Sequence, residues 1–349
     1  MYCLELAGED DAFAACEARS AASGVEVVAP GVAVAKGVVP ERVRTLAYTH
    51  RASELVGRTD ADVGSARALL EAARFDASRE GSVAVRAHDV RGSTGVSTGT
   101  AERELGQVLV DRGFSVDLDD PDHVLRAVFS RGPVDADDAL SRPADGPSDL
   151  DEADVCTLGW LAVESVRDYG SRKPTDRPFF QPGSMAPLDA RAFVNVAGAR
   201  PGATVLDPMC GTGGTLIEAS LVGADVLGSD AQWKMTNGAR ENLREYAPEG
   251  AAFELLRGDA SRLPLRDDAV DGVVFDAPYG RQSKIERHSL EELVSGALSE
   301  ARRVAPRAVV IADRSWREAA LSAGWELEAL FERRVHRSLT RYVHVLDAL

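Results

Sequence analysis

From residue 203 onward, short apolar segments alternate with longer segments of helical periodicity. This alternation is typical of a doubly wound α/β fold built on a parallel sheet. The predicted strands are 204–207, 225–229, 253–256, 272–276 and 308–312, and the predicted helices are 213–222, 232–246 and 290–304. Two further strands, 325–332 and 335–346, follow each other directly and predict an antiparallel pair at the sheet edge.

The first predicted strand runs into a glycine-rich turn, Asp-Pro-Met-Cys-Gly-Thr-Gly-Gly at residues 207–214. Glycines let the backbone approach a ligand closely at a helix N-terminus. A dinucleotide fingerprint needs a third glycine where this chain has Leu216, which disfavours NAD and FAD. A strand-to-helix turn without a ligand is the other interpretation of this segment taken alone. The candidate cofactor-binding residues here are Asp207, Cys210, Gly211 and Gly213.

Aspartates at the ends of the later strands add contacts for a nucleoside-type cofactor. Asp230 closes the second strand, where its carboxylate can accept hydrogen bonds from both ribose hydroxyls. Asp259 and Ala260 follow the third strand, where an adenine amino group can be received. A single Asp after a strand is often only a turn or helix cap. Four in chain order favour one shared site at the carboxyl ends of the strands, where such sheets bind ligands.

The fourth strand ends in Asp276-Ala277-Pro278-Tyr279. The exocyclic amine of a base is a poor nucleophile because its lone pair is delocalised into the ring. Asp276, with a backbone carbonyl, can accept the amine hydrogens and turn the lone pair toward a sulfonium methyl. Pro278 stiffens the turn, and Tyr279 can stack on a base that has left its helix. Together with the glycine turn, these catalytic candidates predict an S-adenosylmethionine-dependent N-methyltransferase acting on a base.

The amino-terminal half predicts a separate α+β domain over residues 1–168. Its clearest elements are a strand at 83–88, a helix at 101–112 and strands at 124–130 and 155–166, with residues 158–166 also compatible with a helix. Residues 132–154 are dense in Asp, Pro and Ala and predict an acidic loop or partly disordered insert. Residues 169–178 predict a linker to a catalytic domain at 179–349.

The net charge of −16 lacks the basic footprint expected of a nucleic-acid-binding protein. However, only four of the 40 basic residues are lysine, and arginine is the better side chain for bidentate phosphate contact. An acidic, lysine-poor surface suits molar salt, where the Debye length falls to about 3 Å. We therefore predict a halophilic source, whose solvent explains the charge.

No apolar run is long enough to span a membrane, and the first residues lack the features of a signal peptide. The four cysteines and six histidines show no metal-ligand spacing, which predicts reduced thiols and no metal site. The sequence thus predicts a cytoplasmic protein.

Residues 179–349 resemble the archaeal tRNA guanine-10 N2-methyltransferase family. The matching segments are 177–185, the glycine turn 207–214, 276–280 and the C-terminal 334–341. The amino-terminal half looks like a THUMP-containing, ferredoxin-like RNA-binding region, through segments 83–91, 102–106 and 116–121. One departure is Ala277, where the family usually has Pro.

The resemblance implies a class I (Rossmann-like) methyltransferase domain that takes S-adenosylmethionine as cofactor, with Phe180, Pro182 and Gly183 contacting it. It implies RNA contacts by Arg86 and Arg91. The C-terminal arginines, which include Arg337 and Arg341, are either a solvated strand face or RNA contacts.

The implied reaction is methylation of guanine N2 in tRNA by base flipping and direct transfer, with tRNA as partner and the protein as a monomer. The products are N2-methylguanosine and, after a second transfer, N2,N2-dimethylguanosine. Two alternatives stay open: an N-methyltransferase of ribosomal RNA or DNA amino groups, and a non-catalytic RNA-binding protein.

Overall fold

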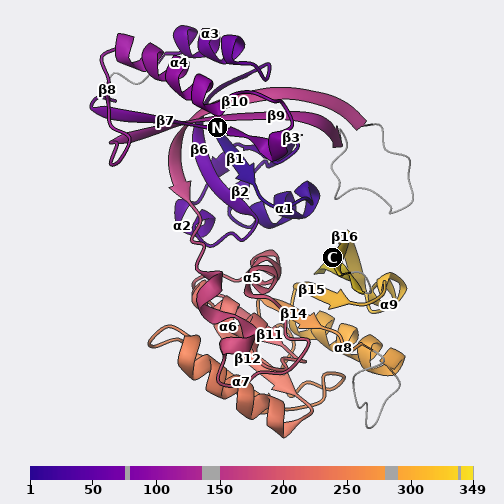
Figure 1. Ribbon diagram of the computed structural model, residues 1–349. Coiled ribbons are helices and arrows are strands. Elements are labelled where there is room, and N and C mark those ends of the chain that lie inside the picture. The colour runs from indigo at the N-terminus through magenta and orange to yellow at the C-terminus, as the bar shows by residue number, and fades with distance from the viewer. Residues whose placement is uncertain (75–78, 136–149, 280–289, 337–338, 349) are drawn as a thin grey trace. The chain divides into compact units, whose positions relative to one another are not determined.

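The computed structural model describes residues 1–74, 79–135, 150–279, 290–336 and 339–348, and these form two compact units that separate between Val166 and Arg167. Each unit is built on its own sheet (Figure 1). We refer to them as unit 1 and unit 2 in chain order. No helix in the described part of the chain is long and apolar enough to cross a membrane.

Unit 1 contains an eight-stranded mixed sheet in the order β3-β4-β1-β6-β10-β9-β7-β8. In that order the strands are Glu26–Ala29, Val32–Ala35, Tyr2–Leu6, Thr49–Thr59, Leu150–Glu164, His123–Asp135, Ser82–Asp89 and Ser115–Val116. A two-stranded sheet joins β2 (Ala22–Ser23) to β5 (Gly37–Val38). The helices are α1 (Asp11–Ala18), α2 (Pro40–Val43), α3 (Val63–Ala72) and α4 (Thr98–Asp111).

The ends of the predicted acidic insert differ from expectation. β9 continues to Asp135 and β10 begins at Leu150, and the two strands pair with Gly132 opposite Ala153. Composition alone suggested a loop here, but the two strands pair through a ladder of hydrogen bonds, and Ala153 of β10 packs against an apolar cluster of unit 1. Residues 136–149 lie outside the described residues. The segment that was compatible with a helix or a strand, 158–166, belongs to β10 as far as Glu164.

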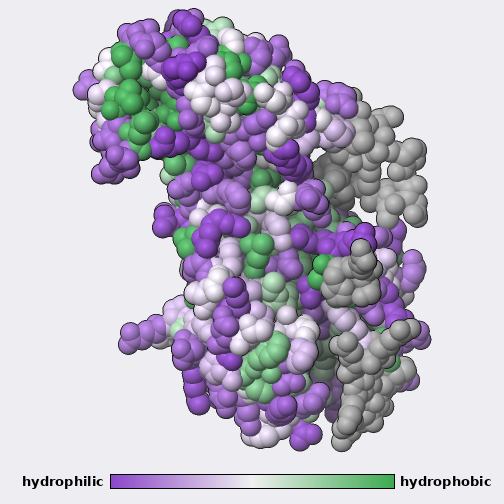
Figure 2. Space-filling view, viewed as in Figure 1, coloured by the Kyte–Doolittle hydropathy of each residue, from purple (hydrophilic) through white to green (hydrophobic). Residues whose placement is uncertain are grey.

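Figure 2 shows that the visible face of unit 1 is largely hydrophilic, with apolar side chains gathered over α4 and β8. The exposed apolar residues in this region are Val110, Val116 and Leu118.

Unit 2 contains a seven-stranded sheet in the order β13-β12-β11-β14-β15-β17-β16. In that order the strands are Phe253–Arg257, Asp225–Asp230, Thr204–Asp207, Gly272–Asp276, Arg307–Ala312, Leu339–Ala348 and Trp325–His336. The first five are parallel, whereas β17 runs antiparallel to both of its neighbours. The predicted α/β fold with an antiparallel last pair is confirmed. The helices are α5 (Pro187–Val196), α6 (Gly214–Leu221), α7 (Trp233–Tyr246), α8 (Leu290–Val304) and α9 (Arg317–Ser322).

The sheet of unit 2 is buried on both faces at its centre. Phe275 and Val310 pack with α8 in one apolar cluster. Val274 and Val309, which point to the opposite face because side chains alternate along a strand, are equally inaccessible. Two-sided burial explains why these strands are continuous apolar runs in the sequence.

Two helices of unit 2 and one strand boundary were not anticipated. The sequence did not predict α5 or α9, and residues 169–176 of the predicted linker contain two short 3-10 turns. The predicted strand at 335–346 begins later, at Leu339, because β16 continues as far as His336.

Candidate active site

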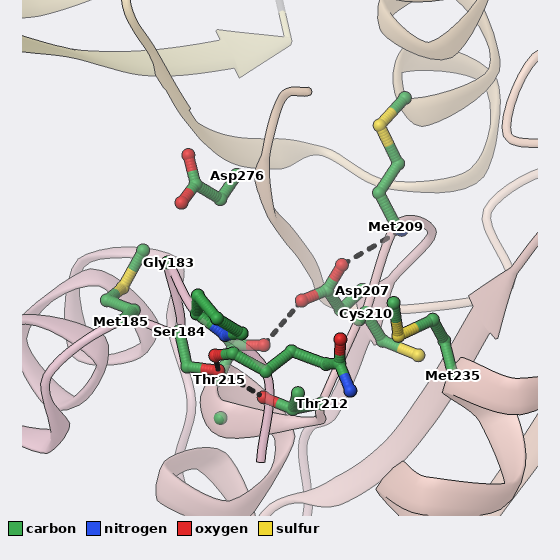
Figure 3. A pocket seen from close by; sticks show the side chains of 14 residues that line it. Gly183, Ser184, Met185, Asp207, Met209, Cys210, Thr212, Thr215, Met235 and Asp276 are labelled. Carbon is green, nitrogen blue, oxygen red and sulfur yellow. Dashed lines mark hydrogen bonds between the residues drawn. The ribbon is translucent and has the colours of Figure 1, made fainter. Parts of the chain in front are cut away.

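A cavity of about 210 Å³ lies beside the carboxyl ends of β11 and β14 (Figure 3). Four segments line it: the loop before α5, the glycine turn with the start of α6, α7 and the end of β14. The lining residues are Gln181, Pro182, Gly183, Ser184, Met185, Asp207, Met209, Cys210, Gly211, Thr212, Gly214, Thr215, Met235 and Asp276. Pro182, Gly183, Asp207, Cys210 and Gly211 were predicted to bind a cofactor, and Asp276 to act in catalysis.

Asp207 is almost fully buried at the base of the cavity. Its carboxylate accepts hydrogen bonds from the Met209 backbone N–H (3.0 Å) and from the Thr215 hydroxyl (Figure 3). Burial raises the pKa of this carboxyl to about 7. Asp207 thereby ties the end of β11 to the first turn of α6 and fixes the shape of the loop between them.

Gly213 precedes α6 with a left-handed backbone, φ +77°, and a Cβ added there would lie 3.0 Å from Cβ of Ala239 on α7. Both the conformation and the close approach require glycine. Gly211 also has positive φ, and an added Cβ would meet nothing within 4 Å. The turn therefore leaves open space in front of a helix N-terminus whose first N–H groups have no partner within the helix.

Asp230 braces the same turn from the neighbouring strand. Its two oxygens accept hydrogen bonds from the backbone N–H groups of Gly211 (3.1 Å) and Gln232 (2.9 Å). The side chain is half-buried, and burial raises its pKa. It does not line the cavity, so its contact with ribose hydroxyls stays a prediction.

The other predicted cofactor contacts lie outside the cavity lining. Asp259 accepts hydrogen bonds from the backbone N–H (2.9 Å) and hydroxyl (2.7 Å) of Ser261, as a turn-capping residue does. Ala260 is buried in the apolar cluster beneath α8. Phe180 is exposed. The roles of these three residues stay predictions.

The loop before α5 is held against the glycine turn by residues that the sequence patterns did not single out. Asn242 of α7 is fully buried. Its carbonyl oxygen accepts the Phe179 N–H (2.9 Å), while its amide donates to the carbonyls of Phe179 (2.8 Å) and Thr212 (2.9 Å). The hydroxyls of Ser184 and Thr212 lie 3.2 Å apart, and a Cβ on Gly238 would lie 2.0 Å from the Phe179 ring. A signal existed in the sequence: Gly238 and Asn242 are spaced one helical turn apart in a polar helix.

Asp276 stands at the mouth of the cavity with 27% of its side chain exposed. It accepts a hydrogen bond from the Tyr279 hydroxyl (2.9 Å). Burial raises its pKa to about 6, opposed by the charge of Arg341 and by the Tyr279 hydrogen bond. The adjacent Ala277 donates its N–H to the carbonyl of Ile311 (2.7 Å). A proline at this position would lack that N–H, so Ala277 fastens the turn by a hydrogen bond that a proline could not make.

The four predicted RNA contacts have different surroundings. The Arg86 guanidinium donates to the Leu118 carbonyl, and that of Arg91 pairs with Asp11 (2.7 Å). Arg337 lies outside the described residues. Only 8% of the Arg341 side chain is exposed, and the side chain lies beside Asp276. Little of its surface is therefore available for phosphate contact. A role in RNA binding stays a prediction for each.

Within the described residues, no group of three or more His, Cys, Asp or Glu side chains could hold a metal ion. What the cavity offers is a helix N-terminus, three methionines and a carboxylate at its mouth. This arrangement can hold a nucleoside-type molecule and present an acceptor oxygen to a second substrate.

Several known proteins are similar to this chain. Residues 174–343 match the family model described as UPF0020: RMKL-like, methyltransferase domain. The chain is 34% identical over 314 residues to a tRNA (guanine(10)-N2)-dimethyltransferase of Methanothermobacter thermautotrophicus, covering 87% of this chain and 84% of that protein. It is 27% identical over 319 residues to an enzyme of the same name from Pyrococcus abyssi, covering 87% and 85%. A crystal structure of TrmN from Thermus thermophilus aligns over 100% of both chains with 24% identity and a TM-score of 0.48.

Proposed function

The chain belongs to the tRNA (guanine(10)-N2)-dimethyltransferase family, and on that basis we propose that it uses S-adenosylmethionine to methylate N2 of guanine 10 in tRNA. The products are N2-methylguanosine and N2,N2-dimethylguanosine. The observation that carries the site assignment is the position of Asp276. Its carboxylate lines the same cavity as the glycine turn, so an acceptor for the amine lies next to the place where the cofactor would bind.

The residues of the cavity fit the cofactor. S-adenosylmethionine supplies an electrophilic methyl group on a sulfonium. Gly211 and Gly183 line the cavity, and an added Cβ at either would meet nothing within 4 Å, so the backbone leaves a cradle there. The N-terminus of α6 favours the carboxylate of an amino-acid moiety. Met209 and Met235 add apolar surface for the remainder of the molecule.

Asp276 would accept a hydrogen bond from the N2 amine and so localise the lone pair of N2 on the side that faces the methyl group. A carboxyl with a pKa of about 6 is mostly ionised at neutral pH and can also take the proton that N2 loses after transfer. Tyr279 holds one oxygen of Asp276 in place, and its ring can stack on the flipped guanine. Rate enhancement then comes mainly from positioning and acceptor geometry.

Three further expectations complete the proposal. Unit 1, with its mixed sheet, is assigned as the THUMP-containing region that docks the tRNA body, while unit 2 carries the chemistry. The acidic, lysine-poor composition supports a halophilic source. We assign a monomer.

The test is methyl transfer from labelled S-adenosylmethionine to unmodified tRNA transcripts in high salt, followed by nucleoside analysis. Label at guanine N2 of position 10 is the expected result. Asp276→Ala should lower turnover about 100-fold or more while the cofactor still binds. Label on ribosomal RNA or DNA instead of tRNA would overturn the substrate assignment, and wild-type turnover by the variant would remove Asp276 from the mechanism.

A further inference from the structure

Arg341 lies on β17 behind the acceptor turn. Its Nε donates to the hydroxyl of Tyr279 (3.3 Å), and one terminal nitrogen lies 4.0 Å from a carboxylate oxygen of Asp276. The other terminal nitrogen lies 3.5 Å from a carboxylate oxygen of Asp189, in the first turn of α5. The guanidinium is therefore anchored on one side and directed at both functional groups of the turn on the other.

The donor and acceptor roles in this cluster are fixed by chemistry. A guanidinium only donates, so the Tyr279 oxygen must accept from Arg341. The single hydroxyl proton of Tyr279 is then left for Asp276, whose oxygen lies 2.9 Å away. Without Arg341 this hydroxyl could rotate and accept from a protonated carboxyl instead.

We propose that Arg341 is a positioning residue that keeps Asp276 ionised and sets the direction of the Tyr279 hydroxyl. The proposal rests on the function given above, since it concerns how the acceptor of that reaction is kept in its accepting form. An ionised carboxylate can only accept hydrogen bonds, whereas a protonated one also carries a donor and is mismatched to an N2–H. Arg341 would thus act through Asp276, without touching the base.

The other charges around Asp276 show why one cation matters. Burial and the nearby Asp313 raise the pKa of Asp276, while Arg341 and the Tyr279 hydrogen bond lower it. Asp207, at the base of the same cavity, has its own pKa raised in part by Asp276, so the two carboxyls repel each other as anions. Because the pKa of Asp276 is about 6, a small further rise of this pKa would leave much of the carboxyl protonated at neutral pH. Arg341 is the one cation among the groups that shift its pKa in the described part of the chain.

The test compares wild type, Arg341→Gln and Arg341→Lys in single-turnover methyl transfer to tRNA between pH 5.5 and 9, with S-adenosylmethionine affinity measured by calorimetry. For Arg341→Gln we expect the acidic limb of the rate profile to move up by about 1 to 3 pH units, as for loss of an opposite charge at this distance. From a starting pKa of about 6, such a shift should lower the rate at pH 7 by about 2-fold for one unit and about 90-fold for three. The rate should recover toward pH 9, with unchanged cofactor affinity. Arg341→Lys keeps a charge and should keep most of the limb in place.

Two controls separate this role from a structural one. Arg333→Gln removes a guanidinium that also lies 3.5 Å from Asp189 but on the neighbouring strand β16, and it should leave the limb where it is. In an Asp276→Asn background, where the acceptor cannot titrate, adding Arg341→Gln should change the rate by less than about threefold because the coupling is lost.

The outcomes are distinguishable from failure of the proposed function. No transfer by wild type at any pH would reject the function itself. If the wild type is active and the acidic limb of the Arg341→Gln rate profile lies at the same pH as that of the wild type, the positioning role is rejected. A uniform loss of rate at every pH, with weakened cofactor binding, would show that Arg341 is only structural.

Discussion

Asn242→Leu removes the tether, the set of Asn242 hydrogen bonds that joins the loop before α5 to the glycine turn, while keeping a branched side chain of similar size. Three hydrogen bonds to backbone groups are lost, two at Phe179 and one at Thr212. At about 1 kcal/mol net for each, the free energy of unfolding should fall by about 3 kcal/mol. Chemical denaturation of the cofactor-free protein measures this change.

Cofactor affinity should fall as well, because this loop forms one wall of the cavity. If binding must then order only one additional residue, the cost is about 1–2 kcal/mol, which raises the dissociation constant about tenfold. Isothermal titration calorimetry with S-adenosylmethionine measures this constant.

Thr236→Val is the matched control, because Thr236 is a buried residue of the same helix, α7. Thr236 is fully buried, and its hydroxyl donates only within α7, to the carbonyl of Trp233 (3.1 Å). It should cost about 1 kcal/mol of stability and leave the dissociation constant unchanged. If Asn242→Leu folds and binds the cofactor as tightly as wild type, the idea that this tether preorganises the cavity is refuted.

Two other predictions concern packing and pH. Gly238→Ala gains about 1 kcal/mol of helix propensity, but its Cβ would lie 2.0 Å from the Phe179 ring, an overlap that costs about 1–3 kcal/mol. Calorimetry should therefore show weaker cofactor binding. A stabilised variant with unchanged affinity would show instead that the Phe179 ring moves freely. His344 is buried and neutral, with Nε2 accepting from the Trp316 N–H (2.8 Å) and Nδ1 facing the Val310 carbonyl (3.1 Å). Burial lowers its pKa from 6.5 to about 4, so its contribution is complete above pH 6.5 and is lost as pH falls toward 4, by about 3 kcal/mol. Denaturation curves of wild type and His344→Gln should converge over that range, and parallel curves would contradict the assignment.

The carboxyl ends of the strands that carry the candidate aspartates in unit 2 could be predicted because they rest on local patterns. Short segments that carry adjacent Val and Leu or Phe residues end in Asp207, Asp230 and Asp276, and the structure ends strands β11, β12 and β14 at these aspartates. The antiparallel pair at the edge was also predictable, because no helix separates the last two strands. The end of β9 was not, because pairing with β10 depends on a partner 20 or so residues away rather than on local composition.

In the candidate site too, some residues follow from local sequence patterns and others depend on packing between distant segments. Asp276 and the glycine turn could be identified from residue type and chain order, whereas the tether by Asn242 depends on how α7 packs against a loop 63 residues earlier. Arg341 was predicted on an RNA-contacting or solvated strand face because its neighbours in the sequence are arginines. The structure places it beside Asp276, since β17 inserts between β15 and β16.

The sequence by itself predicted which residues carry the chemistry: the turn glycines, the strand-end carboxylates and Tyr279 follow from spacing along a single segment each. Only the tertiary structure decided which charges and hydrogen bonds surround them. The pKa of Asp276 depends on its burial and on Arg341, 65 residues away in the chain. Solvation and Coulomb interactions act through space, so no local pattern encodes them until the sheet brings β14 and β17 to either side of β15.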